Sequence, residues 1–207
     1  MLYHQFAWTY DLVSWFVSWG QWQEWIRLPL SYLEEGPILE LGCGPGHLLL
    51  ATQKEGKSIF GLDLSPQMLR ISRKRLINAN LLPVLTNSDG RSLPFASGRF
   101  TQAVATFPTE YVFTLQTLQE IYRVLDEKGE FICIPMAWIS EKGTVYRFLG
   151  WLFRITGQSR DLNNLHLEKI INLFSKAGFH LQWEIVPLKH SNVLLFRASK
   201  DINVSAK

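Results

Sequence analysis

The stretch Ile38-Leu39-Glu40-Leu41-Gly42-Cys43-Gly44-Pro45-Gly46-His47 decides the fold. Its apolar beginning is typical of a short buried strand, and glycines at alternate positions permit a turn in which the backbone approaches a ligand closely. A dinucleotide-binding fingerprint places its third glycine one position later, where this chain has His47. A carboxylate at Glu40 would repel a diphosphate and suits a ligand that carries a cation. The stretch therefore predicts a strand, a ligand-binding turn and a helix.

Strand-like and helix-like runs alternate beyond this stretch. We predict strands at about 37–41, 58–62, 82–86, 101–106 and 130–135, and helices at about 46–55, 66–79, 114–125 and 166–177. This alternation predicts a parallel sheet with helices on both faces. Gly178 is placed to cap the last helix, and two apolar runs at 180–186 and 193–198 then predict a closing antiparallel pair of strands.

Two segments do not belong to this alternation. Residues 1–34 contain five of the eight tryptophans and predict an N-terminal helical cap, because the charged residues between 10 and 28 argue against a membrane span. Residues 136–165 predict a lid insertion with a helix at about 145–155, since a long insertion near the ends of strands commonly carries a binding element. We expect the whole chain, 1–207, to form a single domain.

Composition excludes several classes of protein. With 47% hydrophobic and 19% charged residues, the chain is not intrinsically disordered. A net charge of +3 is too small to indicate nucleic-acid binding without a clustered basic face, and the basic residues at 70 and 73–75 are expected to form a solvated helix surface. Cys43 and Cys133 lie far apart, and no histidine has metal-ligand spacing, so we expect no metal site. Reduced cysteines and the absence of a leader pattern predict a cytoplasmic protein.

The segment Glu40 to Gly46 resembles motif I of the class I S-adenosylmethionine (SAM) dependent methyltransferases. The stretches 89–100 and 123–130 resemble later motifs of the same family, although Thr101 stands where the family usually has Asp. The segment from Tyr10 to Trp22 is similar to the beginning of ubiquinone/menaquinone biosynthesis C-methyltransferases. The resemblance implies an α/β, Rossmann-like, doubly wound fold with a seven-stranded, mostly parallel sheet. It also implies SAM as cofactor and S-adenosylhomocysteine as product.

The same resemblance assigns the cofactor site. It implies that the methionine end of SAM lies against Gly42, Cys43, Gly44 and Gly46, beside Glu40. Asp63 ends the second strand, where a carboxylate can accept both ribose hydroxyls. Ser65 or Asp63, followed by Pro66, is also a suitable cap for the next helix, and the two roles can hold at once. Further cofactor contacts are expected at Tyr10, Leu64, Met68, Asp89, Gly90 and Thr106. Asp89 would accept the adenine amine or simply form an Asp-Gly turn, and Tyr10 is equally well explained as a core aromatic.

Methyl transfer from a sulfonium is an in-line displacement, and holding the two reacting atoms together can supply much of the rate without a dedicated base. Glu110, Tyr111 and His166 are available acid–base groups, but no spacing identifies any of them as catalytic. The stretch 106–109 (Thr-Phe-Pro-Thr) lacks the amide or acid and the second proline that enzymes methylating nucleobase amines carry there. This absence argues against a nucleobase acceptor.

We therefore predict methyl transfer to a small, hydrophobic acceptor such as a quinone precursor or another lipid. Two other functions stay open: a non-catalytic SAM-binding regulatory protein, and a methyltransferase acting on RNA or protein. The aromatic cap and the lid insertion would either touch a membrane surface peripherally or simply enclose a dry pocket. The sequence leaves open whether the protein is a monomer or a homodimer.

Overall fold

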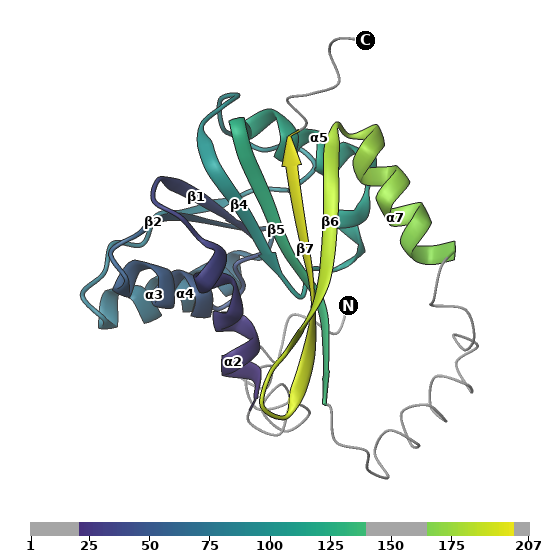
Figure 1. Cartoon of the computed structure of the whole chain (residues 1–207). Helices are drawn as coiled ribbons and strands as arrows, with labels where there is room; N and C mark the ends of the chain where they lie inside the picture. The colour runs from purple at the N-terminus through teal and green to yellow at the C-terminus, as the bar shows by residue number, and fades with distance from the viewer. Residues whose placement is uncertain (1–20, 140–164, 201–207) are drawn as a thin grey trace.

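A computed structural model of the chain describes residues 21–139 and 165–200. One seven-stranded sheet has the order β3-β2-β1-β4-β5-β7-β6 (Figure 1). Its strands are β1 (Pro37–Leu41), β2 (Ser58–Asp63), β3 (Leu85–Asn87), β4 (Phe100–Thr106), β5 (Leu125–Ile139), β6 (Phe179–Pro187) and β7 (Ser191–Lys200). The strands from β3 to β5 pair in parallel, and β7 runs antiparallel to β5 and β6. The predicted Rossmann-like, doubly wound sheet with its antiparallel ending is confirmed.

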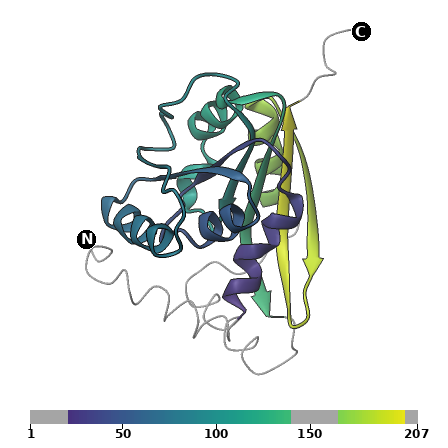
Figure 2. The ribbon, with the colours of Figure 1, turned by 90° about the vertical axis from the view of Figure 1, so that its left-hand side faces the viewer.

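Helices cover both faces of the sheet, as Figures 1 and 2 show from two sides. They are α2 (Trp22–Arg27), α3 (His47–Lys54), α4 (Pro66–Asn78), α5 (Leu115–Val124) and α7 (Leu165–Lys176), with short 3-10 helices η1 (Leu28–Tyr32) and η2 (Glu110–Phe113). Helices α2, α3 and α4 contribute buried residues to one hydrophobic cluster, and α5 and α7 contribute to the other. The sheet lies between the two clusters, which is the arrangement that parallel sheets require.

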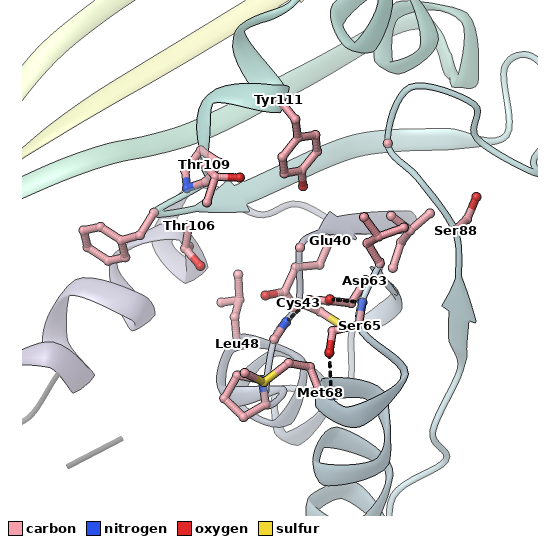
Figure 3. A pocket seen from close by; sticks show the side chains of 18 of the residues that line it. Glu40, Cys43, Leu48, Asp63, Ser65, Met68, Ser88, Thr106, Thr109 and Tyr111 are labelled. Carbon is pink, nitrogen blue, oxygen red and sulfur yellow. Dashed lines mark hydrogen bonds between the residues drawn. The ribbon is translucent and has the colours of Figure 1, made fainter. Parts of the chain in front are cut away.

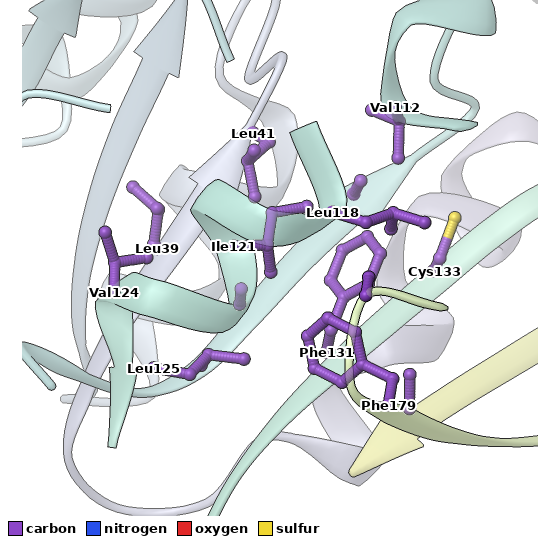
Figure 4. Close-up of a cluster of buried hydrophobic side chains, with 14 of the residues drawn as sticks. Leu39, Leu41, Val112, Leu118, Ile121, Val124, Leu125, Phe131, Cys133 and Phe179 are labelled. Carbon is purple, nitrogen blue, oxygen red and sulfur yellow. The ribbon is translucent and has the colours of Figure 1, made fainter. Parts of the chain in front are cut away.

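The continuous apolar run of β1 follows from this double burial. Ile38 belongs to the cluster under α2, α3 and α4, whereas Leu39 and Leu41 belong to the cluster under α5 and α7 (Figure 4). Aromatic rings fill much of the second cluster, and the rings of Phe131 and Phe174 stack with their centroids 6.2 Å apart. Because strands alternate their side chains between faces, a strand buried on both sides needs apolar residues at successive positions. Glu40 interrupts the run, and its surroundings belong to the site described below.

The four predicted helices are present with ends that differ by at most one residue. Gly178 follows the last of them with a φ of 94°, as expected of a glycine that ends a helix. The third strand was predicted at 82–86, and this is wrong: β3 covers only Leu85–Asn87. Pro83 has no N–H to donate to a ladder, and the side chain of Leu82 is 74% exposed.

The fifth strand is also longer than the predicted 130–135. It runs from Leu125 to Ile139, with a register shift opposite Phe100 and Gln102 that accommodates residues 126–129. Its far end pairs antiparallel with β7 as far as Ile139 opposite Ser191. Residues 136–139 are therefore strand rather than the beginning of an insertion. The remainder of the predicted lid, 140–164, with its expected helix at 145–155, lies outside the described residues.

The N-terminal cap is described from residue 21 onward, so Tyr10 lies outside the described residues. The α-helix ends at Arg27 and continues as η1, whose first turn contains Pro29. Trp25 is buried against the sheet, where its Nε1 donates a hydrogen bond of 2.8 Å to Ser191 Oγ. Among the described residues, no helix is long and apolar enough to cross a membrane.

Candidate functional site

A cavity of about 640 Å³ opens where β1, β2 and β4 end. Ligands of open α/β sheets bind at this edge, outside the carboxyl ends of the strands. Figure 3 shows side chains from the turns after these strands converging on it. Ten of the twelve residues predicted to contact the cofactor line the cavity: Glu40, Gly42, Cys43, Gly44, Asp63, Leu64, Met68, Asp89, Gly90 and Thr106.

The glycine turn between β1 and α3 needs its glycines for two different reasons. Gly42, Gly44 and Gly46 have φ angles of 67°, 51° and 78°, in the left-handed region that side-chain-bearing residues rarely adopt. A Cβ at Gly44 would have no neighbour nearer than 4.0 Å, so this position leaves space in the cavity. A Cβ at Gly46 would overlap Ser72 of α4. Gly46 does not line the cavity, and it allows α3 and α4 to pack closely.

Asp63, the last residue of β2, ties the glycine turn to the start of α4. Its Oδ2 accepts a hydrogen bond of 2.8 Å from the Gly44 N–H, and its Oδ1 accepts one of 2.8 Å from the Ser65 N–H (Figure 3). Ser65 in turn caps α4, because its Oγ accepts a hydrogen bond from the Met68 N–H. Each carboxylate oxygen keeps a second acceptor site. The capping role and a ligand-binding role are therefore compatible.

Asp89 and Gly90 form the side of the cavity beyond β3. The guanidinium of Arg91 binds both carboxylate oxygens of Asp89, at 3.0 Å from Nε to Oδ1 and 2.6 Å from Nη2 to Oδ2. These hydrogen bonds lower the pKa of Asp89 to about 2. The Arg91 N–H also bonds to Asp89 Oδ1, so the expected turn chemistry is present. Asp89 thus presents an ionised, oriented carboxylate at the mouth of the cavity.

Glu40 is the most unusual group of the site, because only 2% of it is exposed. Burial, followed by the negative charge of Asp63, raises the pKa of the Glu40 carboxyl well above its ordinary value. Its Oε2 has no hydrogen-bond partner within the described part of the chain. A buried polar atom without a partner is costly unless a ligand satisfies it. Such an atom in the lining of the cavity fits a ligand that brings a cation or a hydrogen-bond donor.

Tyr111 was considered only as an acid–base group, yet it shapes the cavity. A Cβ added at Gly42 would lie 3.0 Å from its Oη, and one added at Gly90 would lie 2.7 Å from its Cε2. The ring therefore spans the space between two glycines that follow different strands, β1 and β3. Burial raises the pKa of the Tyr111 phenol, which keeps it neutral. Glu110 is exposed and does not line the cavity, and His166 lies in the first turn of α7.

Sequence reasoning did not assign several other lining residues to the cofactor site. They are Ile26, Pro45, His47, Leu48, Leu62, Ser65, Pro66, Ser88, Arg91, Phe107, Pro108, Thr109 and Tyr111. Most of them adjoin a predicted contact in sequence, so their position at the end of the same strand was the available signal. No local pattern indicated Ile26, since it comes from α2 and reaches the cavity only through tertiary packing.

Comparison with known proteins agrees with this geometry. A family model described as a methyltransferase domain matches residues 38–129. A demethylmenaquinone methyltransferase of Symbiobacterium thermophilum is 34% identical over an alignment of 209 positions, gaps included, that covers 86% of this chain and 83% of the relative. The chain is a class I SAM-dependent methyltransferase. A second demethylmenaquinone methyltransferase, from Thermus thermophilus, is 30% identical to this methyltransferase, covering 89% of the chain and 94% of the relative.

Solved structures share the fold of this methyltransferase. A SAM-dependent methyltransferase from Thermotoga maritima superposes with a TM-score of 0.65 at 19% identity, covering 95% of this chain and 97% of that one. A geranyl diphosphate C-methyltransferase from Streptomyces coelicolor, solved with S-adenosylhomocysteine, has a TM-score of 0.61 at 13% identity and covers 85% and 79% of the two chains.

The cavity fits SAM, the cofactor of this family, on the observations above. The glycine turn leaves space at Gly44, and Asp63 keeps free acceptor sites beside that turn. Glu40, whose Oε2 has no partner within the described part of the chain, lines the same cavity. Acidic groups at Glu40, Asp63 and Asp89 suit a ligand that carries positive charge and several hydrogen-bond donors.

Proposed function

We propose that this enzyme methylates a small, hydrophobic acceptor of the quinone-precursor class. The observation that carries the proposal is the uneven charge of the cavity. The carboxyl and guanidinium groups of the lining belong to the turns and ends of β1, β2 and β3, and they are those of Glu40, Asp63, Asp89 and Arg91. The five lining residues that end or follow β4, which are Thr106, Phe107, Pro108, Thr109 and Tyr111, carry no charge. An apolar half beside a charged half suits an apolar acceptor held next to a charged cofactor.

In this proposal, the charged half binds SAM. The methionine end would lie against Gly42, Cys43 and Gly44 near Glu40, and Asp63 would accept hydrogen bonds from the ribose hydroxyls. Asp89 would accept the adenine amine, between the exposed side chain of Leu64 and Gly90. Met68 and Thr106 would complete the contacts. Gly46 acts through packing, since it lies outside the cavity.

Bound SAM supplies an electrophilic methyl group on a positively charged sulfur. The chain's own contribution is to hold the acceptor at the end of β4 and to exclude water from it. Ile26 and Leu48, which come from α2 and α3, and Phe107 and Pro108 give that end an apolar wall. A ring carbon activated by a neighbouring hydroxyl, as in a reduced quinone precursor, needs little more than this placement. The demethylmenaquinone methyltransferases that the chain resembles support this acceptor class.

Turnover tests the proposal. The purified enzyme is incubated with SAM and a short-chain demethylmenaquinol, and the methylated product and S-adenosylhomocysteine are measured by mass spectrometry. A phenol, a phospholipid vesicle, transfer RNA and a protein extract serve as competing acceptor classes. Stoichiometric methylation of the quinol is expected. Methylation of the RNA or protein alone would refute the small-acceptor assignment, and SAM binding without turnover of any acceptor would favour a regulatory protein.

A further inference from the structure

Phe107, directly after β4, has a backbone conformation that its side chain disfavours. Its φ is 50°, and among the described residues only Asn80 is another non-glycine residue with positive φ. Asn80 is an exposed asparagine just after α4, where the left-handed conformation is common. A bulky aromatic residue in this region is a true outlier. Such strain is retained where the surrounding structure imposes it, most often at functional sites.

The contacts of Phe107 show what imposes the conformation. Its N–H donates a hydrogen bond of 2.7 Å to Ile134 O, so the backbone remains attached to β5 although β4 has ended. Its ring stacks on Trp22, with centroids 4.8 Å apart and planes at 27°, and lies 6.1 Å from the ring of Trp25. The hydrogen bond from Trp25 to Ser191 anchors this second indole to the hairpin of β6 and β7. Two rings of α2 thus support Phe107 while it lines the cavity.

Phe107 belongs to the uncharged half of the cavity lining. Thr106 precedes it, and Figure 3 shows Thr106 and Thr109 across Glu40 from Ser88, which lies near the end of β3. A flat ring that is backed by a second ring presents a rigid aromatic surface rather than a deformable aliphatic one. Stacking adds to the affinity of a planar ligand beyond the area that it buries. It adds nothing for a puckered, saturated ligand of the same size.

We propose that Phe107, supported by Trp22, is a specificity-determining residue that selects planar aromatic or quinonoid acceptors over saturated ones. This inference rests on the proposed function, because it concerns the acceptor half of the same cavity. The strained backbone is the consequence of turning the ring toward α2 while the main chain stays bonded to β5. Methyl transfer itself is unchanged in this proposal, and only the choice of acceptor depends on the ring.

Binding of a matched pair of ligands tests this selectivity directly. Naphthol and its fully saturated counterpart, decahydronaphthol, are titrated into the S-adenosylhomocysteine complex of the wild type and of Phe107→Leu, Phe107→Tyr and Asn80→Gly. Leu keeps the apolar volume and loses the flat ring, whereas Tyr keeps the ring. We expect Phe107→Leu to weaken naphthol binding by about three- to tenfold and to leave decahydronaphthol unchanged. Phe107→Tyr and Asn80→Gly should retain the preference of the wild type.

Unchanged affinity of every variant for S-adenosylhomocysteine shows that the fold and the cofactor half are intact. Equal weakening of both ligands by Phe107→Leu, or no preference for naphthol in the wild type, overturns the inference. These outcomes are independent of turnover. If a quinol is methylated while the naphthol preference is absent, the proposed function stands and the role of Phe107 fails. If the preference is present while no quinol is methylated, the quinone assignment fails and the selectivity of the ring stands.

Discussion

Replacing Gly46 by alanine should destabilise the enzyme without weakening its affinity for SAM. Gly46 has a φ of 78° and borders Ser72 of α4 rather than the cavity. Gly44 provides a matched control, because its φ is 51°, it lines the cavity, and a Cβ there would have no neighbour nearer than Gly42 O at 4.0 Å. The same substitution at two positions two residues apart therefore separates helix packing from ligand binding.

The expected magnitudes come from two separate terms. A non-glycine residue in the left-handed region costs roughly 1–2 kcal/mol, and this term applies to both variants. Overpacking a well-filled site costs about 1–3 kcal/mol more, and this term applies only to Gly46→Ala, whose Cβ overlaps Ser72. We expect losses in the free energy of unfolding of about 2–5 kcal/mol for Gly46→Ala and about 1–2 kcal/mol for Gly44→Ala.

Urea denaturation of the two variants, followed by circular dichroism, measures the losses. Ser72→Ala should restore part of the overpacking term of about 1–3 kcal/mol to Gly46→Ala, because it removes the nearest atom, Ser72 Oγ, and leaves Ser72 Cβ at 3.0 Å from the added Cβ. Alone it should cost little, because Ser72 Oγ is buried with no partner among the described residues. Isothermal titration of the folded fraction should show wild-type SAM affinity in Gly46→Ala and a weaker affinity in Gly44→Ala. Equal stability losses in the two glycine variants, or no recovery with Ser72→Ala, would refute the packing argument.

Three further predictions concern single polar contacts. Because the pKa of Glu40 is raised above its ordinary 4.5, the free energy of unfolding should fall as pH rises above that value, by up to about 1.4 kcal/mol per pH unit. Urea denaturation of Glu40→Gln at several pH values should lack this slope. The variant should also bind SAM more weakly. Arg91→Ala should raise the pKa of Asp89 from about 2 toward its ordinary 3.8 in an NMR titration. The unfolding transition should change little, because the ion pair is exposed. An unchanged pKa of Asp89 would contradict the role of Arg91. Trp25→Phe should cost about 1–3 kcal/mol in thermal unfolding, because it leaves the buried Ser191 hydroxyl without its indole partner, and an unaltered melting temperature would exclude that role.

The fold was predictable because its local signals agree with one another. Apolar runs alternate with amphipathic ones, Ser65 and Pro66 begin α4, and Gly178 ends α7. The boundaries that sequence reasoning missed depend on pairing between distant strands. The extension of β5 to Ile139 exists because β7 runs beside it, and β7 follows β5 by more than fifty residues in the sequence.

The position of the candidate site was predictable because each of its main sequence signals lies at the end of a strand. The glycine turn follows β1, Asp63 ends β2 and Asp89 follows β3, and the topology brings these strand ends together. The glycine spacing in the sequence could not show that Gly44 lines the cavity while Gly46 packs against α4. Both are glycines of one turn, and only the approach of α4 distinguishes them. Likewise, nothing local indicates that the ring of Phe107 meets Trp22, because this contact joins the end of β4 to α2.

Calorimetric titration of SAM and S-adenosylhomocysteine into the wild type and Asp63→Ala tests the central claim most directly, with Asp126→Ala as the matched control, because Asp126 is a half-buried aspartate of β5 that does not line the cavity. One hydrogen bond to a charged group contributes about 1.5–3 kcal/mol. Asp63→Ala should therefore weaken both ligands at least about tenfold, while Asp126→Ala binds like the wild type. A folded wild type that binds neither ligand, or an Asp63→Ala variant with unchanged affinity, would contradict a cofactor site organised by the glycine turn and Asp63.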